Sequence, residues 1–144
     1  MATNIPPTEL QALEDLYHAT NGDEWTWHRQ NISNGFPWNF SAVVAVNENP
    51  CTKPWQAVVC LTPAPTDLYY HVSELLLVDY NLHGTISESL NQLQQLNNLQ
   101  IAINPRLVGT IPSSLSELSQ LQHLALWTNQ LTGTIPPSVG NLSQ

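Results

Sequence analysis

The residue types that usually perform chemistry occur in this 144-residue chain, but their spacing assembles no recognisable catalytic or metal site. The five histidines are scattered along the sequence: His18, His28, His71, His83 and His123. None of them belongs to an H-E-x-x-H motif or to a Cys/His cluster with metal-ligand spacing. The chain also lacks a phosphate-binding glycine loop and a G-x-S-x-G elbow. The sequence therefore predicts a non-enzymatic protein that uses no metal or other cofactor.

One acid–base pair, Asp79 and His123, is predicted to lie on a common surface. The two residues belong to the first and third of three predicted parallel strands, which places them at least about 10 Å apart. Direct proton transfer requires a separation of about 3 Å between the heavy atoms. The pair is therefore not expected to act as a catalytic dyad.

The two cysteines, Cys51 and Cys60, have two interpretations. A disulfide between them would close a small loop and stabilise the fold by roughly 2.5–3 kcal/mol on the loop-entropy model. Without the bond, they would be two buried thiols in a reducing compartment. Their spacing is compatible with both states.

Three asparagines, Asn31, Asn39 and Asn141, each begin an N-x-S triplet, the acceptor motif for N-glycosylation. Asparagine and serine are so abundant in this chain that about two such triplets would arise by chance. The motif therefore marks these three residues as candidate glycosylation sites and gives weak evidence for the modification itself.

Composition excludes several partner classes. The net charge is -8, and the fixed cations are Arg29, Lys53 and Arg106, which argues against binding nucleic acid. No apolar run is long enough to span a membrane. The start, MATNIPPTEL, has neither the basic residues nor the apolar core of a signal peptide.

The C-terminal half repeats itself. The segments NLHGTISESL, RLVGTIPSSL and QLTGTIPPSV align on Gly84, Gly109 and Gly133, which are 24 or 25 residues apart. A leucine-rich strand pattern precedes each glycine, and a period in the twenties is typical of a solenoid. In the first repeat the following side chains are expected to point into the core: Val72, Leu75, Leu77, Leu82, Ile86, Leu90 and Leu93.

Strand alternation predicts a solvent-facing strip on the concave side of the repeats. Its candidate binding residues are Leu76, Val78, Asp79, Gln100, Ala102, Ile103, His123, Ala125 and Trp127. The strip is unusually apolar for a solvent face, and such patches often mark contact surfaces. Trp127 is the preferred anchor because large aromatic residues dominate interface energetics. The alternative is that the strip is covered by the rest of the chain or by further repeats.

The N-terminal half reads as a helix followed by an aromatic region. Thr8-Glu9-Leu10-Gln11 has the form of a capping box, and Asn21-Gly22 supplies a left-handed stop, so a helix is expected over residues 8–20. The tryptophans between residues 23 and 50 are expected to fill a core beneath the loops. A stacking site for a sugar or peptide is the alternative.

The segments ALEDLYHATNGDEW and CTKPWQAVVC resemble the N-terminal cap of plant-type leucine-rich-repeat proteins, which usually carries C-x-x-x-W-x-G-V-x-C. Ala57 stands where that family usually has glycine, and the stretch 28–50 has no counterpart in it. Residues 72–144 resemble the family's repeat, L-x-x-L-x-L-x-x-N-x-L-x-G-x-I-P-x-x-L-x-x-L.

This resemblance implies an α/β repeat solenoid with short parallel strands on its concave face. Residues 1–70 would form a helical cap closed by a Cys51–Cys60 disulfide, and residues 71–144 would form three repeats without a C-terminal cap. The family also implies extracellular recognition, as in receptor-like proteins and inhibitors of cell-wall polygalacturonases. We therefore expect a secreted or cell-surface protein that binds a protein or peptide on its concave face.

Two other functions are compatible with the sequence. The first is a structural surface or matrix protein that assembles end to end through an apolar edge, formed by Leu131, Ile135, Val139 and Leu142. The second is binding to an ordered lattice, such as ice or glycan, through the regular ladder of Thr85, Thr110 and Thr134. The threonines are more simply explained as part of the repeat consensus.

Overall fold

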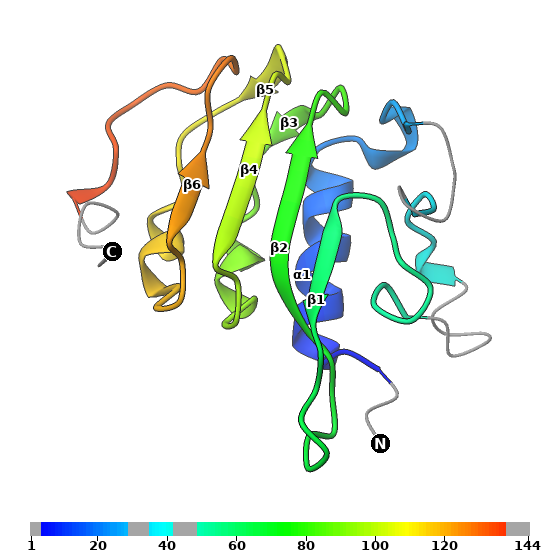
Figure 1. The fold of residues 1–144 in the computed structure, drawn as a ribbon. Coiled ribbons are helices and arrows are strands. Elements are labelled where there is room, and N and C mark those ends of the chain that lie inside the picture. Colours follow the sequence, from blue (N-terminus) through cyan, green and yellow to red (C-terminus); the bar gives the residue numbers. More distant parts are fainter. Residues whose placement is uncertain (1–3, 29–34, 42–48, 138–144) are drawn as a thin grey trace.

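A four-stranded sheet is the largest element of the fold (Figure 1). The computed structural model describes residues 4–28, 35–41 and 49–137. The strands of the sheet, in spatial order, are β1 (Val58–Leu61), β2 (His71–Val78), β4 (Asn98–Ala102) and β6 (His123–Ala125). The three repeat strands β2, β4 and β6 run parallel, as the glycine-aligned repeats predicted.

Strand β1 was not predicted as part of this sheet. It pairs antiparallel with β2, with Val59 opposite Glu74 and a register shift after Val59. The pairing adds a strand from the cysteine loop to the edge where the repeats begin. The sequence-based interpretation assigned this loop a disulfide but no strand.

The chain that follows β2 and the chain that follows β4 form a second layer. β3 (His83–Thr85) and β5 (Arg106–Val108) pair in a small parallel sheet. The 3-10 helices η2 (Glu88–Gln92) and η3 (Ser113–Glu117) follow them and contact each other. Each turn of chain thus passes from the large sheet to the small sheet and then to a short helix before the next strand.

The core lies between these layers. All seven predicted core side chains of the first repeat are at most 5% exposed, which confirms that prediction. Their counterparts Leu99, Ile101 and Leu107 in the second repeat are fully buried. Burial of this kind stabilises by about 1.5–3 kcal/mol for each large aliphatic side chain.

Two asparagines join successive repeats through their side chains. The Nδ2 of Asn104 donates to the carbonyls of Leu77 (3.0 Å) and Ala102 (2.8 Å). Its Oδ1 accepts from the backbone N–H groups of Tyr80 (3.2 Å) and Leu82 (3.1 Å). In the next turn, Asn129 donates to two carbonyls and accepts from the N–H of Asn104. These bonds satisfy backbone groups inside the turn.

Helix α1 (Pro7–Ala19) packs against η2 and contacts β3. The capping-box prediction is wrong, because the N-cap is Pro6 and no side chain caps the helix. Glu9, the second residue of the expected box, instead turns its carboxylate toward strand β2. At the other end, Asn21 adopts the left-handed conformation (φ 56°), so the predicted stop is confirmed.

The aromatic residues pack into the core, as predicted for most of those between residues 23 and 50. Trp25, Trp38 and, beyond that range, Trp55 are each at most 5% exposed. The indole N–H of Trp25 donates to the carbonyl of Thr20 (3.1 Å), and that of Trp38 donates to the carbonyl of Gln56 (2.7 Å). Trp25 also contacts Tyr80 edge to face, so the aromatic core continues into the first repeat.

Candidate recognition surface

Strand register arranges the predicted site residues in rows across the sheet. We call the exposed side of this sheet the recognition face. Its first row contains Val59, Glu74, Asn98 and His123, and its second contains Leu76, Gln100 and Ala125. The third row begins with Val78 and Ala102, and Trp127 lies two residues beyond the end of β6. The register thus brings most of the predicted strip onto one surface.

The start of the parallel strands carries a polar network. The Nδ2 of Asn98 donates to the carboxylate of Glu74 (2.9 Å), and the Nε2 of Gln100 donates to the Oδ1 of Asn98 (3.1 Å). His123 is exposed in the same row. Because these side chains hold one another, this part of the face presents fixed donors and acceptors with one carboxylate among them.

The other end of the strands is apolar. Leu76, Val78 and Ala125 are half-buried, whereas Trp127 is 56% exposed. A cavity of about 560 Å³ adjoins Trp127, and its lining residues are Ile111, Gln122, Leu124, Ala125, Leu126, Trp127 and Ile135. An exposed indole beside an apolar cavity is the kind of surface that anchors a partner.

Three predicted members of the strip differ in the structure. Ala102, in register with Val78, is fully buried, so its short methyl group offers no contact surface. Asp79 and Ile103 have left-handed backbone (φ 61° and 56°), so strand alternation does not determine the direction of their side chains. Asp79 remains exposed, and Ile103 is half-buried.

The register also separates Asp79 from His123. His123 lies in the row of Glu74, five residues before Asp79 and two strands away. The structure therefore does not bring this acid and this base together. Within the described ranges, no group of three or more His, Cys, Asp or Glu side chains could hold a metal ion.

Sequence reasoning missed one residue of the recognition face, Val59 on β1, which is 41% exposed. Val59 lies opposite Glu74 and so extends the face beyond the first repeat. The segment Val58–Leu61 (VVCL) has no apolar/polar alternation that would indicate a half-exposed strand, and the cysteine motif favoured a loop.

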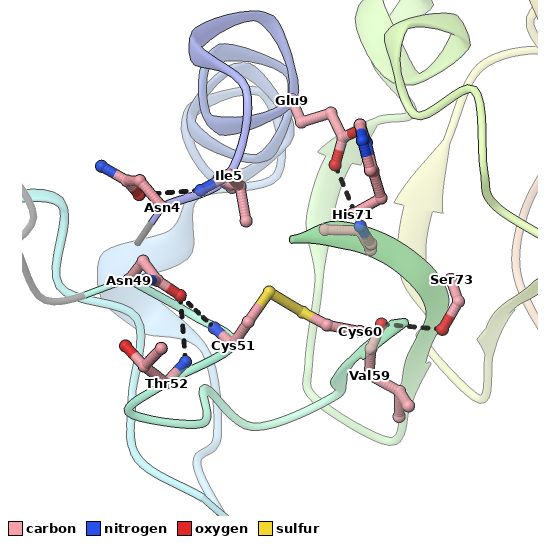
Figure 2. The surroundings of a disulfide bond; sticks show 11 residues. Asn4, Ile5, Glu9, Asn49, Cys51, Thr52, Val59, Cys60, His71 and Ser73 are labelled. Carbon is pink, nitrogen blue, oxygen red and sulfur yellow. Dashed lines mark hydrogen bonds and ion pairs between the residues drawn. A yellow bond between two sulfur atoms is a disulfide. The ribbon is translucent and has the colours of Figure 1, made fainter. Parts of the chain in front are cut away.

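Figure 2 shows the disulfide that fixes this added strand. Cys51 and Cys60 are bonded, with their Cα atoms 5.6 Å apart. Beside the bond, the Oδ1 of Asn49 accepts from the backbone N–H groups of Cys51 (2.8 Å) and Thr52 (2.9 Å). Because Cys60 belongs to β1, the bond ties the loop before the strand directly to the edge of the sheet.

A second tie joins α1 to β2, also visible in Figure 2. The carboxylate of Glu9 accepts from the backbone N–H of Val72 (2.9 Å) and lies 2.6 Å from the Nδ1 of His71. Burial raises the pKa of Glu9, and the hydrogen bonds to His71 and Val72 oppose that rise. Glu9 is only 2% exposed, so the hydrogen bonds to these two partners replace nearly all the hydrogen bonds that water would make to the carboxylate.

The remaining predicted residues lie away from the recognition face or outside the described ranges. Asn39 is exposed, and Asn31, Asn141, Val139 and Leu142 fall outside the described residues. Leu131 is half-buried and Ile135 is 68% exposed. The three threonines of the proposed ladder are exposed: Thr85, Thr110 and Thr134. In the part of the chain that the structure describes, every helix is too short or too polar to cross a membrane.

Comparison with known proteins identifies the class of fold. No protein-family model matches the chain. The folds that match are those of leucine-rich-repeat ectodomains from plant receptor kinases. A curated sequence, a probable leucine-rich-repeat receptor-like serine/threonine-protein kinase of Arabidopsis thaliana, is 41% identical over 56 residues, which are 39% of this chain and 6% of that protein.

Three solved structures illustrate the match. The SOBIR1 ectodomain of Arabidopsis thaliana is 24% identical with a TM-score of 0.66, and the match covers 97% of this chain and 64% of that ectodomain chain. The GASSHO1/SCHENGEN3 ectodomain of Arabidopsis thaliana was solved in complex with CASPARIAN STRIP INTEGRITY FACTOR 2. It is 32% identical with a TM-score of 0.64, and the match covers 95% of this chain and 14% of that one. A plant ice-binding protein is 24% identical with a TM-score of 0.69, over 96% and 38%. The chain therefore has the leucine-rich-repeat fold and spans only part of these proteins.

Proposed function

We propose that this protein is a non-enzymatic recognition module that binds a peptide or protein segment across its recognition face. The observation that carries the proposal is Trp127, a large aromatic side chain that is 56% exposed beside an apolar cavity. Leaving an indole in water is unfavourable, and burying it against a partner would contribute much of the binding energy.

Charge indicates the chemistry of the partner. Glu74 supplies a carboxylate on the recognition face, and Asp79 is exposed directly after β2. Of the fixed cations that the structure describes, Lys53 lies over the ring of Phe36 and Arg106 belongs to β5 in the small sheet. A segment with an apolar side chain for Trp127 and a basic residue for Glu74 would therefore complement the face.

The same proposal covers the arrangement of the chain. Residues 1–70 would act as a helical cap that closes the first turn of a repeat solenoid, and residues 71–144 would form three repeats whose concave side is the recognition face. Packing of α1 on η2 supports the cap, and the disulfide supports an oxidising compartment. The GASSHO1/SCHENGEN3 ectodomain, which shares the fold, was solved with a bound factor, in keeping with recognition at the cell surface or after secretion.

Peptides selected from a random display library against the intact chain would test the proposal. Trp127→Ala should weaken the selected peptides at least tenfold, because the substitution removes the anchor. Leu68→Ala is the matched control: Leu68 is 76% exposed and lies in the connection between β1 and β2, so binding should not change. Equal affinity of every selected peptide for both variants would overturn recognition through this face.

A second candidate is end-to-end self-assembly through β6. Leu124, Leu126 and Leu131 are only half-buried, whereas the equivalent Leu99, Ile101 and Leu107 are fully buried. Light scattering over a concentration series would test this function. Self-assembly predicts a mass that rises with concentration and falls in Ile135→Asp, because Ile135 is 68% exposed beside the same cavity. A monomer at all concentrations would exclude it.

A further inference from the structure

A cavity between α1 and the aromatic segment belongs to neither the recognition face nor the β6 edge. Its volume is about 260 Å³. The lining residues are Glu14, Tyr17, His18, Asp23, Trp38, Asn39, Phe40 and Ser41. Both the acceptor asparagine and the serine of the Asn39-Phe40-Ser41 triplet lie on its rim and are exposed.

The lining combines the two kinds of group that hold a sugar. The rings of Tyr17 and Phe40 lie edge to face with their centroids 5.4 Å apart, and both are half-buried, so each retains some surface for the C–H face of a pyranose. Glu14 and Asp23 supply carboxylates that accept hydrogen bonds from hydroxyl groups.

The carboxylate of Asp23 is held in place for this role. The hydroxyl of Tyr17 donates to one of its oxygens (3.0 Å), which leaves the second oxygen as an acceptor. Burial and the bond to Asp23 raise the pKa of Tyr17 to about 12, so the phenol stays neutral and keeps donating. The cavity therefore presents an ordered rim beside an exposed asparagine.

We propose that Asn39 carries an N-linked glycan and that its first N-acetylglucosamine packs into this cavity against Tyr17 and Phe40. The Cys51–Cys60 disulfide indicates an oxidising compartment, which in eukaryotic cells is where the donor, a lipid-linked oligosaccharide diphosphate, is available. The amide nitrogen of Asn39 bonds to the anomeric carbon of the sugar and gives up one proton. The bond between that carbon and the diphosphate breaks, and the diphosphate leaves with the electron pair.

The position of the glycan is compatible with binding on the recognition face. In Figure 1 residues 35–41 lie beyond α1 and β1, at the opposite end of the molecule from β6. The sugar would cover the half-exposed aromatic rims of the N-terminal region and leave Trp127 accessible.

Expression of the intact chain behind a heterologous signal sequence in insect cells tests the modification. Mass spectrometry should find a glycan on Asn39 that peptide N-glycosidase removes. Ser41→Ala destroys the acceptor motif while keeping the Asn39 side chain, and Asn39→Gln provides an independent variant; both should lose the glycan from this position. An unmodified Asn39 in the secreted, folded protein would overturn the proposal.

Thermal unfolding tests the packing of the first sugar. The glycoprotein is trimmed enzymatically to one N-acetylglucosamine and compared with the fully deglycosylated protein. The remaining sugar should raise the melting temperature by about 2 °C or more. Glu14→Ala should shrink this difference, whereas Glu117→Ala, on η3, should preserve it. A single sugar with no effect on the melting temperature would overturn its placement in the cavity.

Discussion

At the scale of single residues, the backbone conformation explains one departure from the family pattern. Ala57 replaces the glycine of the cap motif and has a left-handed backbone (φ 66°), which strains residues with a Cβ atom by about 1–2 kcal/mol. Its carbonyl accepts from the N–H of Leu76 (2.8 Å), so the pairing of β1 with β2 holds Ala57 in this conformation.

Ala57→Gly should therefore stabilise the protein. Relief of the strain exceeds the added entropy of glycine in the unfolded chain, and we expect a net gain of about 0.5–1 kcal/mol. Urea unfolding measures the change. Ala125→Gly, in strand β6, is the control and should destabilise. A loss of stability in Ala57→Gly would show that the left-handed conformation carries no strain.

Asn104 contributes more than any exposed asparagine because its side chain is fully buried and serves four backbone groups. Asn104→Ala leaves those groups without partners, at a cost of about 3–5 kcal/mol. Asn91→Ala removes two exposed side-chain bonds, one to Glu117 and one from Gln92, and should cost less than about 0.5 kcal/mol. Chemical denaturation of both variants compares the two costs. A similar loss in both would mean that water satisfies the backbone groups around Asn104.

At the scale of elements, α1 is joined to β2 by a buried carboxylate. Because the pKa of Glu9 is raised from its ordinary value of 4.5, the folded state binds this proton more tightly than the unfolded state does. The corresponding stability is fully present below pH 4.5 and is lost as the pH rises through the raised pKa. Ionisation of this buried carboxyl group therefore costs stability, and the hydrogen bonds to His71 and Val72 offset part of that cost.

Glu9→Gln should flatten this part of the pH profile. Unfolding free energies are measured between pH 4 and pH 8, and the decline assigned to Glu9 should be absent from the variant. Glu14→Gln, on the more exposed side of the same helix, should keep the wild-type profile. If Glu9→Gln retains the same slope as the wild type, another group is responsible for it.

The disulfide acts at the same scale, since it closes the loop between residues 51 and 60 against β1. Replacing both cysteines with alanine should destabilise the protein by about 2–3 kcal/mol. Amide hydrogen exchange should show the largest loss of protection in Val58–Leu61 and little change in β6. An unaltered β1 would show that pairing with β2 is sufficient to hold the strand.

The elements differ in how far the sequence predicts them. Glycine-aligned repeats predicted the parallel strands and the seven core side chains of the first repeat, because both features recur at a fixed period. Strand β1 and the Glu9 tie each occur once and join segments far apart in the chain, so local patterns did not reveal them. The four-residue segment that contains Glu9, Thr8–Gln11, matched a different motif, the capping box. Ala102 was wrongly predicted to be a contact residue. Strand alternation gives the direction in which a side chain points, but it does not show whether neighbouring side chains bury it.

At the scale of the whole molecule, the N-terminal region that we propose as a cap shares one core with the repeats. Trp25 contacts Tyr80, α1 packs on η2, and the N–H of His83 donates to the carbonyl of Thr20 (3.0 Å). A single repeat buries too little surface to offset the entropy of ordering its chain, so repeats gain stability from their neighbours. The cap is the neighbour of the first repeat, and damage to it should reach the later repeats.

Leu13→Ala tests this coupling. Leu13 is fully buried in α1, and its truncation should destabilise the protein by about 2–5 kcal/mol. If the cap and repeats unfold as one unit, hydrogen exchange in β4 should lose as much protection as exchange in α1, because both then open through global unfolding. Leu131→Ala truncates a leucine in the last repeat, at the other end of the molecule from α1. It should destabilise the protein less than Leu13→Ala, since Leu131 is only half-buried. Loss of protection confined to α1 in Leu13→Ala would instead mean that the repeats remain folded without the helix.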